Sequence, residues 1–256
     1  MKLFLTIIFI FLNISLANKL NISDKNILAK VPEASGICYS TISNSLFIAN
    51  DEGTIYEISK SGKILRDKKI GDYDLEGVAC DNDRGLLLFA VEGEDSILVV
   101  SQKRLKIKKK ISIKRKFKGI KVLKKDKKHG LEAITIVDGN IFLSNQSFNS
   151  YPKDDSSVVF QIDNIKRKKA KIIKIINHGH FDISGLTYHK KKLYMISDYK
   201  NLLIIYNLKN EKIVNIIGLP KFAQEGICFD DSNMLYIADD NGRILKFSTL
   251  TFPNSN

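Results

Sequence analysis

The chain has 256 residues, and its formal net charge of +13 would suit a partner that is a nucleic acid. However, the segment from Lys103 to Lys128 contains fifteen Lys or Arg and one acid, so it alone accounts for the excess of positive charge. The rest of the chain is close to neutral, and the export signal described next also argues against a nucleic acid. The length is sufficient for one large core or a closed array of repeats.

Residues 1–17 have the pattern of a secretory signal peptide. Lys2 precedes an uncharged run from Leu3 to Leu16, and Ala17 completes a small-residue exit site. The alternative is an uncleaved membrane anchor, but fourteen helical residues reach only about 21 Å against a hydrocarbon core of about 30 Å. We therefore expect cleavage after Ala17, which leaves a single domain, 18–256. This domain is expected to be periplasmic or secreted. A lipoprotein is excluded because Asn18, not Cys, follows the cleavage point.

A motif then recurs five times, reading Ser or Glu, Gly or Ala, an aliphatic residue and a small residue. Each copy opens a series of short alternating apolar segments separated by turn residues, as in Leu46–Ala49, Ile55–Ile58 and Ile64–Ile70. Such a series predicts a four-stranded antiparallel meander. The five copies begin at Ser35, Glu76, Glu132, Ser184 and Glu225.

The spacing of the motif predicts the architecture. Its Gly or Ala positions are 41, 56, 52 and 41 residues apart, and a four-stranded unit near 41 residues has the size of a β-propeller blade. We predict an all-β fold, a β-propeller of five four-stranded blades, with six as the alternative if a diverged blade lies in the two long intervals. After Gly226 only three strands fit, so the strand near Ile27 to Val31 is expected to complete the last blade and close the ring.

The two long intervals contain insertions. In Lys103 to Lys128 apolar residues alternate with Lys, which favours a strand with one solvated face whose lysines guard an open edge. The alternative is a patch that docks on an anionic lipid or glycan. The second insertion, residues 145–155, is a polar loop with Phe148 and Tyr151, either a lid or a tolerated surface insertion.

Three cysteines are an odd number for an oxidising compartment. Cys38 and Cys228 both occupy the small position of the motif, where the other copies have Ala79, Thr135 and Thr187. We predict buried structural thiols, with Cys38 to Cys228 as the one pair that merits a test.

The motif begins the innermost strand of each blade, so its first residues should meet at one mouth of the central channel. Glu76, Glu132 and Glu225 would repel one another there unless a cation lies between them, and Ca²⁺ tolerates an irregular ring of oxygen ligands. The alternative is that these Glu accept hydrogen bonds from the neighbouring blade or pair with Lys. Weaker candidate ligands at the same mouth are Ser35, Ser184, Asp51, Glu92, Asp198 and Asp239.

Three histidines, His129, His178 and His180, lie in connectors that lead into inner strands. His129 and His180 are the weak candidates for a general base beside a metal-bound water, with ordinary loop histidines as the alternative. No Gly-x-Ser-x-Gly elbow, phosphate-cradling Gly loop or zinc spacing is present in the sequence.

Four segments resemble the SdiA-regulated, YjiK-like family of exported bacterial β-propellers: Glu33-Ala-Ser-Gly-Ile, Phe47-Ile-Ala-Asn-Asp-Glu, Asp74-Leu-Glu-Gly-Val-Ala and Ala223-Gln-Glu-Gly-Ile-Cys. The resemblance implies a propeller fold and a periplasmic or envelope location. The sequence is more distantly similar to phytase-like and lactonase-like propellers, which hold Ca²⁺ in the channel. Carried over by position, this similarity implies Glu76, Glu132 and Glu225 as ligands, although Ala133 replaces a Gly and the lactonase-like His pattern is missing.

Two functions follow as hypotheses. The first is a monomeric binding or scaffold protein of the envelope, with a cation in its channel and a small ligand or envelope protein at the acidic mouth. The second is a Ca²⁺-dependent hydrolase of a phosphoester, ester or lactone.

Overall fold

The computed structural model describes residue 20 and residues 22–248. The predicted signal peptide and its cleavage site lie outside these residues. Within the described part of the chain, the regular elements are strands and one 3₁₀ turn, η1 (Asp24–Asn26). No helix in this part is long and apolar enough to cross a bilayer. The prediction of an all-β fold is therefore confirmed.

Three of the sheets contain four strands each. In each, the strand that carries the motif lies at the inner end of the sheet. The first sheet is β2 (Ala34–Ser40), β3 (Ser45–Asn50), β4 (Thr54–Ser59) and β5 (Ile64–Lys69). Another is β16 (Ile183–His189), β17 (Lys192–Ser197), β18 (Leu202–Asn207) and β19 (Lys212–Gly218). The last is β20 (Gln224–Phe229), β21 (Leu235–Asp239), β22 (Arg243–Phe247) and β1 (Ile27–Lys30).

A larger sheet of eight strands consists of two runs of four that meet at their outermost strands. The first run is β6 (Leu75–Asp81), β7 (Leu86–Val91), β8 (Ser96–Ser101) and β9 (Lys106–Lys114). The second run is β12 (Leu131–Val137), β13 (Asn140–Asn145), β14 (Val159–Ile162) and β15 (Lys169–Ile176). A small separate hairpin consists of β10 (Lys116–Phe117) and β11 (Ile120–Lys121).

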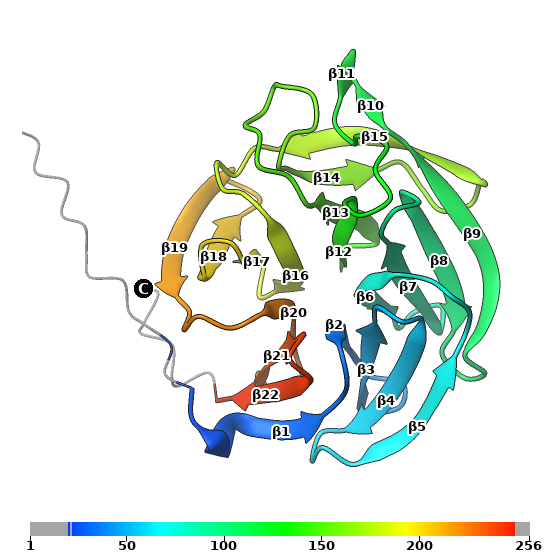
Figure 1. The fold of residues 1–256 in the computed structure, drawn as a ribbon, viewed down its shortest axis with the longest axis vertical. Helices are drawn as coiled ribbons and strands as arrows, with labels where there is room; N and C mark the ends of the chain where they lie inside the picture. Colours follow the sequence, from blue (N-terminus) through cyan, green and yellow to red (C-terminus); the bar gives the residue numbers. More distant parts are fainter. Residues whose placement is uncertain (1–19, 21, 249–256) are drawn as a thin grey trace, which may run out of the picture.

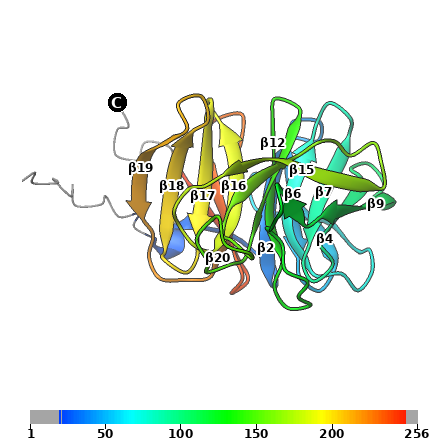
Figure 2. The same ribbon diagram turned by 90° about the horizontal axis from the view of Figure 1, so that it is seen from above.

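The five motif strands form a ring around a central axis, as Figure 1 shows. In ring order they are β2, β6, β12, β16 and β20, and each contacts the next. The strands run along this axis (Figure 2), so the first residues of the motif meet at one end of the ring. Strands near the axis are more buried than strands at the rim because neighbouring sheets cover both of their faces; β3 is buried throughout, whereas β5 at the rim is mostly exposed.

The ring contains five groups of four strands, if the two runs of the larger sheet are counted separately. Each pair of neighbouring groups encloses its own hydrophobic cluster. Between the first two sheets, for example, Phe47 and Phe89 are fully buried. Full burial of one such side chain stabilises the fold by about 1.5–3 kcal/mol. The core is therefore distributed around the ring and leaves the axis free for polar groups.

The ring is closed by the N-terminal strand, as predicted. β1 pairs with β22 in an antiparallel register, with Ile27 opposite Leu245 and Lys30 opposite Arg243. The last sheet thus takes three strands from the C-terminal end of the described chain and one from its N-terminal end. This pairing covers the edge of β22 that would otherwise be open.

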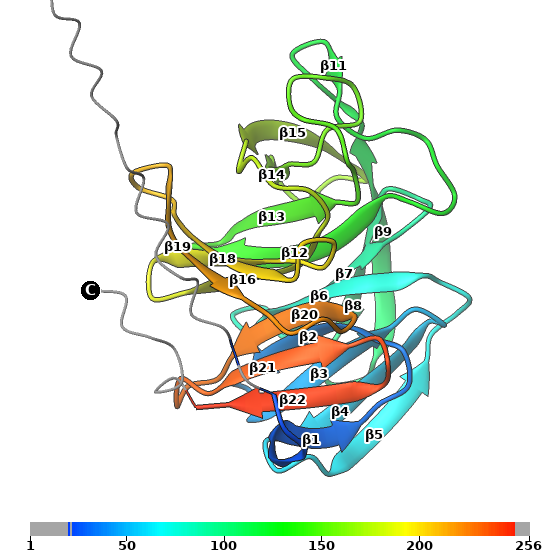
Figure 3. The same ribbon diagram turned by 60° about the vertical axis from the view of Figure 1, so that its left-hand side comes forward.

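One pairing was not predicted from the sequence. The outermost strands β9 and β15 pair in parallel, with Ser112 opposite Lys169 and Lys114 opposite Lys171. Figure 3 shows β9 along the side of the ring, below the projecting hairpin that contains β11. The Lys-rich insertion therefore forms a long outer strand that joins two neighbouring sheets.

The prediction of buried structural thiols is confirmed for Cys228 and wrong for Cys38 and Cys80. Cys38 on β2 forms a disulfide with Cys80 on β6, with 5.7 Å between their Cα atoms, and Cys228 is free and buried. Successive side chains of a strand point to opposite faces of a sheet. Cys38 and Cys228 hold the same position in their repeats, so both side chains face the same way around the ring and cannot face each other. Cys80 lies one residue further along its repeat and faces back toward Cys38.

Candidate metal centre

Every inner strand carries a β-bulge at its copy of the motif. The register with the second strand shifts between Ala34 and Gly36 in β2 and between Leu75 and Val78 in β6. Equivalent shifts occur in β12, β16 and β20. A bulge releases a residue from the ladder and changes the direction of its side chain. The repeated Ser or Glu is therefore the residue that each strand can turn toward the axis.

A cavity of about 180 Å³ lies where these residues meet. Its lining is almost entirely polar, and carboxylates dominate it. A single basic side chain, that of Lys128, joins them among the described residues. The lining residues are Ser35, Asp51, Glu76, Glu92, Lys128, Glu132, Gln146, Asp182, Asp198, Glu225 and Asp240.

Three carboxylates converge at the centre of this cavity, as predicted. One oxygen from each of Glu76, Glu132 and Glu225 lies within 4.8 Å of the other two. Glu132 is only 4% exposed. Within the described part of the chain, none of the three forms an ion pair or accepts a hydrogen bond from a backbone N–H. The alternative role, in which they bond to the neighbouring blade or to Lys, is therefore not the one observed.

The electrostatics of these three Glu are unfavourable without a cation. Burial raises the pKa of Glu132 well above its ordinary value, and the carboxylates of Glu76 and Glu225 raise it further. The pKa of Glu76 is raised by burial first and by Glu225 next, while that of Glu225 is raised by burial and then by Asp198. The protein therefore keeps three acids close together, one buried and two half-buried, and none of them is ion-paired within the described residues.

A second set of carboxylates surrounds the first. Burial is the main cause that raises the pKa of Glu92 and of Asp51 to about 7, with further contributions from Asp74 and Glu33, respectively. Burial also raises the pKa of Asp198 to about 6. Asp74, Glu76 and Glu92 form a further group whose oxygens lie within 4.8 Å of one another. The mouth therefore carries a large negative potential whenever these groups are ionised.

The weaker candidate ligands divide into two groups. Ser35, Asp51, Glu92 and Asp198 line the cavity. Ser184 and Asp239 do not: Ser184 Oγ donates to the carbonyl of Gln224 at 2.9 Å, and Asp239 is paired with Arg243. Ser184 thus bonds to the backbone of the neighbouring strand, and Asp239 bonds to an arginine side chain. Neither lines the cavity.

Four other residues join the cavity or its acidic group without having been predicted as ligands. Asp182 and Asp240 line the cavity, as does Gln146. Asp74 belongs to the group with Glu76 and Glu92. All four lie in connectors next to a strand, where the motif does not reach. The signal available in the sequence is their position directly before an inner strand or after a second strand.

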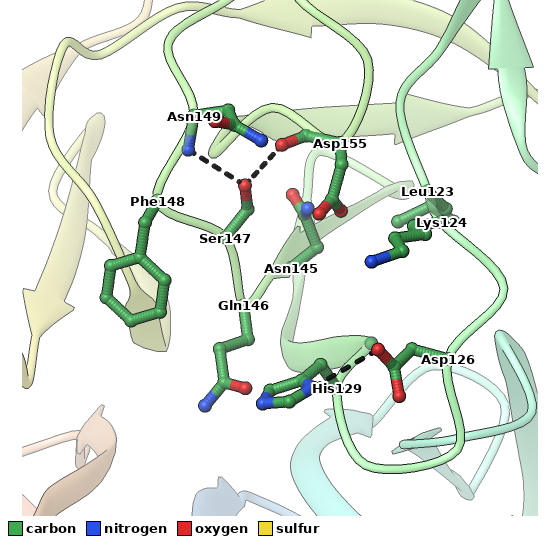
Figure 4. Close-up of a pocket in the computed structure, with 11 residues that line it drawn as sticks. Leu123, Lys124, Asp126, His129, Asn145, Gln146, Ser147, Phe148, Asn149 and Asp155 are labelled. Atoms are coloured by element: carbon green, nitrogen blue, oxygen red, sulfur yellow. Dashed lines mark hydrogen bonds and ion pairs between the residues drawn. The ribbon is translucent and has the colours of Figure 1, made fainter.

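A second pocket of about 240 Å³ lies beside the mouth, and Gln146 lines both spaces. Figure 4 shows its residues: the imidazole of His129 beside Asp126, Gln146 next to them, and Phe148 at one side. Nδ1 of His129 is 3.3 Å from Asp126 Oδ2. The two insertions of the chain build this pocket, because its walls come from residues 123–130 and 145–155.

The other predicted histidines lie outside both spaces. His178 is buried, and its Nδ1 accepts a hydrogen bond from the backbone N–H of His180 at 3.2 Å. The two rings are 6.5 Å apart. Neither His178 nor His180 lines the cavity at the mouth or the pocket beside it.

Comparison with known proteins agrees with this architecture. The family model of SdiA-regulated proteins matches residues 13–248. A search of curated proteins finds no match. Glutaminyl cyclase from Myxococcus xanthus is a similar solved structure, with a TM-score of 0.64 and 12% identity over 86% of this chain and 91% of that chain.

Two further structures are less similar. The β-propeller domain of Cps50 (Swd1) from Myceliophteria thermophila has a TM-score of 0.48 and 9% identity, over 88% of this chain and 69% of that chain. Virginiamycin B lyase from Staphylococcus aureus has a TM-score of 0.47 and 16% identity, over 83% of this chain and 65% of that chain. The 12% identity to the cyclase shows the fold and not the activity. The family model covers most of the chain, and this protein therefore belongs to the SdiA-regulated family.

Proposed function

We propose that this β-propeller binds one divalent cation, with Ca²⁺ as the best fit, between Glu76, Glu132 and Glu225. The observation that carries the proposal is the convergence within 4.8 Å of one buried and two half-buried carboxylates, none of which forms an ion pair with a basic side chain of the described residues. A cation removes the mutual repulsion and satisfies all three groups at once. We further propose that the protein acts in the cell envelope, as a binding or scaffold protein with its ligand or partner at the acidic mouth.

The ligand geometry that each ion requires favours Ca²⁺ over Mg²⁺. Oxygens that lie within 4.8 Å of one another can contact either ion, because oxygens on opposite sides of Ca²⁺ are about 4.6–5.2 Å apart and those on opposite sides of Mg²⁺ about 4.0–4.2 Å. Ca²⁺ accepts about six to eight oxygens in an irregular arrangement, whereas Mg²⁺ requires a nearly ideal octahedron. Ser35 at the cavity wall is available as a further oxygen ligand.

Calorimetric titration tests the cation site. The protein from residue 18 is treated with a chelator, dialysed and titrated with CaCl₂, beside Glu132→Gln and the control Glu211→Gln, which removes a carboxylate on the far edge at β19. We expect one site in the wild type and in Glu211→Gln, and affinity at least about tenfold lower in Glu132→Gln. Absence of binding in the wild type, or equal binding in Glu132→Gln, overturns the proposal.

A second function, cation-dependent hydrolysis of a phosphoester, ester or lactone, is favoured by the pocket beside the mouth. Asp126 orients the imidazole of His129 there, which is the arrangement of a general base near a metal-bound water. Generic substrates of these three classes are assayed with and without Ca²⁺. Turnover lost on chelation and in His129→Asn supports the hydrolase; no turnover of any substrate rejects it.

A further inference from the structure

The rim of the molecule at β9 and β15 presents a single exposed face that is almost wholly basic. Exposure alternates along β9 from Lys106 to Lys114, and along β15 from Lys169 to Ile173. The parallel register places the exposed positions of the two strands side by side. We name this face the basic rim; it consists of Lys106, Lys108, Lys110, Lys114, Lys169 and Lys171, with Ser112 and Ile173 between them.

The lysines of the basic rim lie close to like charges and have few acidic partners. Lys114 is directly opposite Lys171 in the register, and like charges in such positions destabilise a sheet. Of the six lysines, only Lys110 forms an ion pair within the described residues, with Glu94. Three more basic residues, 166–168, are exposed in the turn that leads into β15. The folded protein therefore concentrates positive charge here at a cost in stability.

Protection of an open strand edge accounts for only part of this arrangement, because β15 leaves the stretch of β9 from Lys106 to Lys110 uncovered. Lysines on an edge strand commonly prevent pairing with another molecule. However, the outer edge of β9 is already paired with β15 where Ser112 to Lys114 lie opposite Lys169 to Lys171. The N–H of Ser112 also donates to the carbonyl of Lys168 at 3.0 Å. The lysines at this end of β9 thus guard no open edge.

We propose that the basic rim docks on a membrane surface rich in anionic phospholipid. Regularly spaced lysines on a twisted but open sheet face suit an extended layer of headgroup phosphates, and their aliphatic stems allow the ammonium groups to reach it. Ile173 is 47% exposed among them and supplies an apolar side chain for the interfacial region. This proposal uses a different surface from the cation site and does not depend on it.

The position of the basic rim has a consequence for the channel. β9 and β15 lie at the outer side of the ring, away from the axis (Figure 1). Docking by this side places the ring edge-on to the membrane. The acidic mouth then remains open to solvent, and a ligand reaches it without displacing the lipid.

Co-sedimentation with vesicles tests the proposal. The protein from residue 18, which keeps every described strand, is mixed with vesicles of 70% phosphatidylcholine and 30% phosphatidylglycerol, or of phosphatidylcholine alone. We expect binding to the anionic vesicles only, weakening steeply between about 0.05 and 0.5 M NaCl. Binding to both kinds of vesicle, or binding that salt does not weaken, overturns the proposal.

Two matched variants locate the surface. K108Q/K114Q/K169Q/K171Q removes four charges from the basic rim, and K63Q/K190Q/K209Q/K212Q removes four exposed charges elsewhere. Because each Lys near an anionic surface contributes about the same increment, removal of four should weaken binding on the order of a thousandfold in the first variant and much less in the second. Equal loss in both variants overturns the assignment of the surface. Binding to heparin without binding to vesicles identifies a glycan instead and overturns the lipid proposal.

Discussion

His178 is a titratable residue that the fold keeps neutral. Its side chain is 4% exposed, and its Nε2 has no hydrogen-bond partner among the described residues. Burial lowers its pKa to about 3, and the neighbouring His180 adds to this effect. In the unfolded chain the same group has a pKa of about 6.5. The folded and unfolded states therefore bind different numbers of protons across a wide range of pH.

This difference predicts how stability changes with pH. The pKa of His178 is lower in the folded state than in the unfolded state, so neutral His178 contributes fully to the free energy of unfolding above about pH 6.5. This contribution is lost as the pH falls toward 3, by up to about 1.4 kcal/mol per pH unit. His178→Asn keeps an acceptor for the N–H of His180 and removes the titration. We expect urea unfolding at pH 7.5 and 5.0 to show a smaller loss of stability on acidification in His178→Asn than in wild type. The exposed His129→Asn is the control; the same loss in all three proteins contradicts the prediction.

The sequence predicts some of the individual residues of the site and not others, for a physical reason. Glu76, Glu132 and Glu225 could be predicted because the repeat places them at equivalent positions, and equivalent positions meet on the axis. Asp182 could not be assigned as a ligand, because it lies in a connector whose length and conformation differ between repeats. Backbone conformation decides where such a residue points; Asp182, for example, has a φ of 54°.

The inner strands approach one another closely at the Gly of the motif. A Cβ added to Gly77 on β6 would lie 2.6 Å from the carbonyl oxygen of Glu132 on β12. A Cβ added to Gly36 on β2 would lie 2.4 Å from the carbonyl oxygen of Glu76. In β12 the equivalent residue is Ala133, so the contact between β12 and β16 accommodates a methyl group. The ring is therefore less tight at one of its five contacts.

Two reciprocal substitutions measure this asymmetry. Gly77→Ala should lower the free energy of unfolding by about 3 kcal/mol, since the new methyl group meets backbone atoms that cannot rotate away. Ala133→Gly should cost only about 1 kcal/mol, from the greater freedom of Gly in a strand. Guanidinium unfolding monitored by far-UV circular dichroism gives both values. Similar costs for the two changes would mean that the inner strands adjust to a side chain at either contact.

The disulfide joins β2 and β6 and closes a loop of 42 residues in the chain. Loss of such a link typically lowers the free energy of unfolding by about 2–4 kcal/mol, chiefly because the unfolded chain gains freedom. We expect this loss in a Cys38→Ala, Cys80→Ala double variant, and the same loss when wild type is unfolded in dithiothreitol. Cys228→Ala is the control and should remain sensitive to the reductant. A wild type that unfolds identically with and without dithiothreitol argues against the bridge.

For the whole molecule, the propeller could be predicted because five copies of one motif can bury their inner strands only by closing around an axis. The joining of two sheets through β9 and β15 could not. Alternating Lys and apolar residues indicate a strand with one solvent-exposed face. They carry no information about which edge of that strand pairs with another strand. That choice depends on the length of β9 and on the turn before β15, which bring distant segments together.

The joined sheets predict an unusual pattern of amide exchange. Outermost strands of a sheet usually exchange fast because one edge is open to solvent. Here the amides of Ser112 to Lys114 lie between β8 and β15, whereas β5 and β19 have no strand on their outer side within the described residues. Hydrogen exchange followed by mass spectrometry should show slower exchange for Ser112 to Lys114 than for the outer strands β5 and β19. Exchange as fast as in β5 would mean that the pairing opens readily.

The closure of the ring by β1 also has a consequence for the order of synthesis. β1 is among the first strands to leave the ribosome, and its partner β22 is the last, with Ile27 paired to Leu245. The final contact cannot form until the chain has been made as far as residue 247. A chain that stops short leaves β1 without its partner and the circle open, with exposed edges that invite aggregation or proteolysis. The pairing of β1 with β22 can therefore form only in a chain that has been made through residue 247.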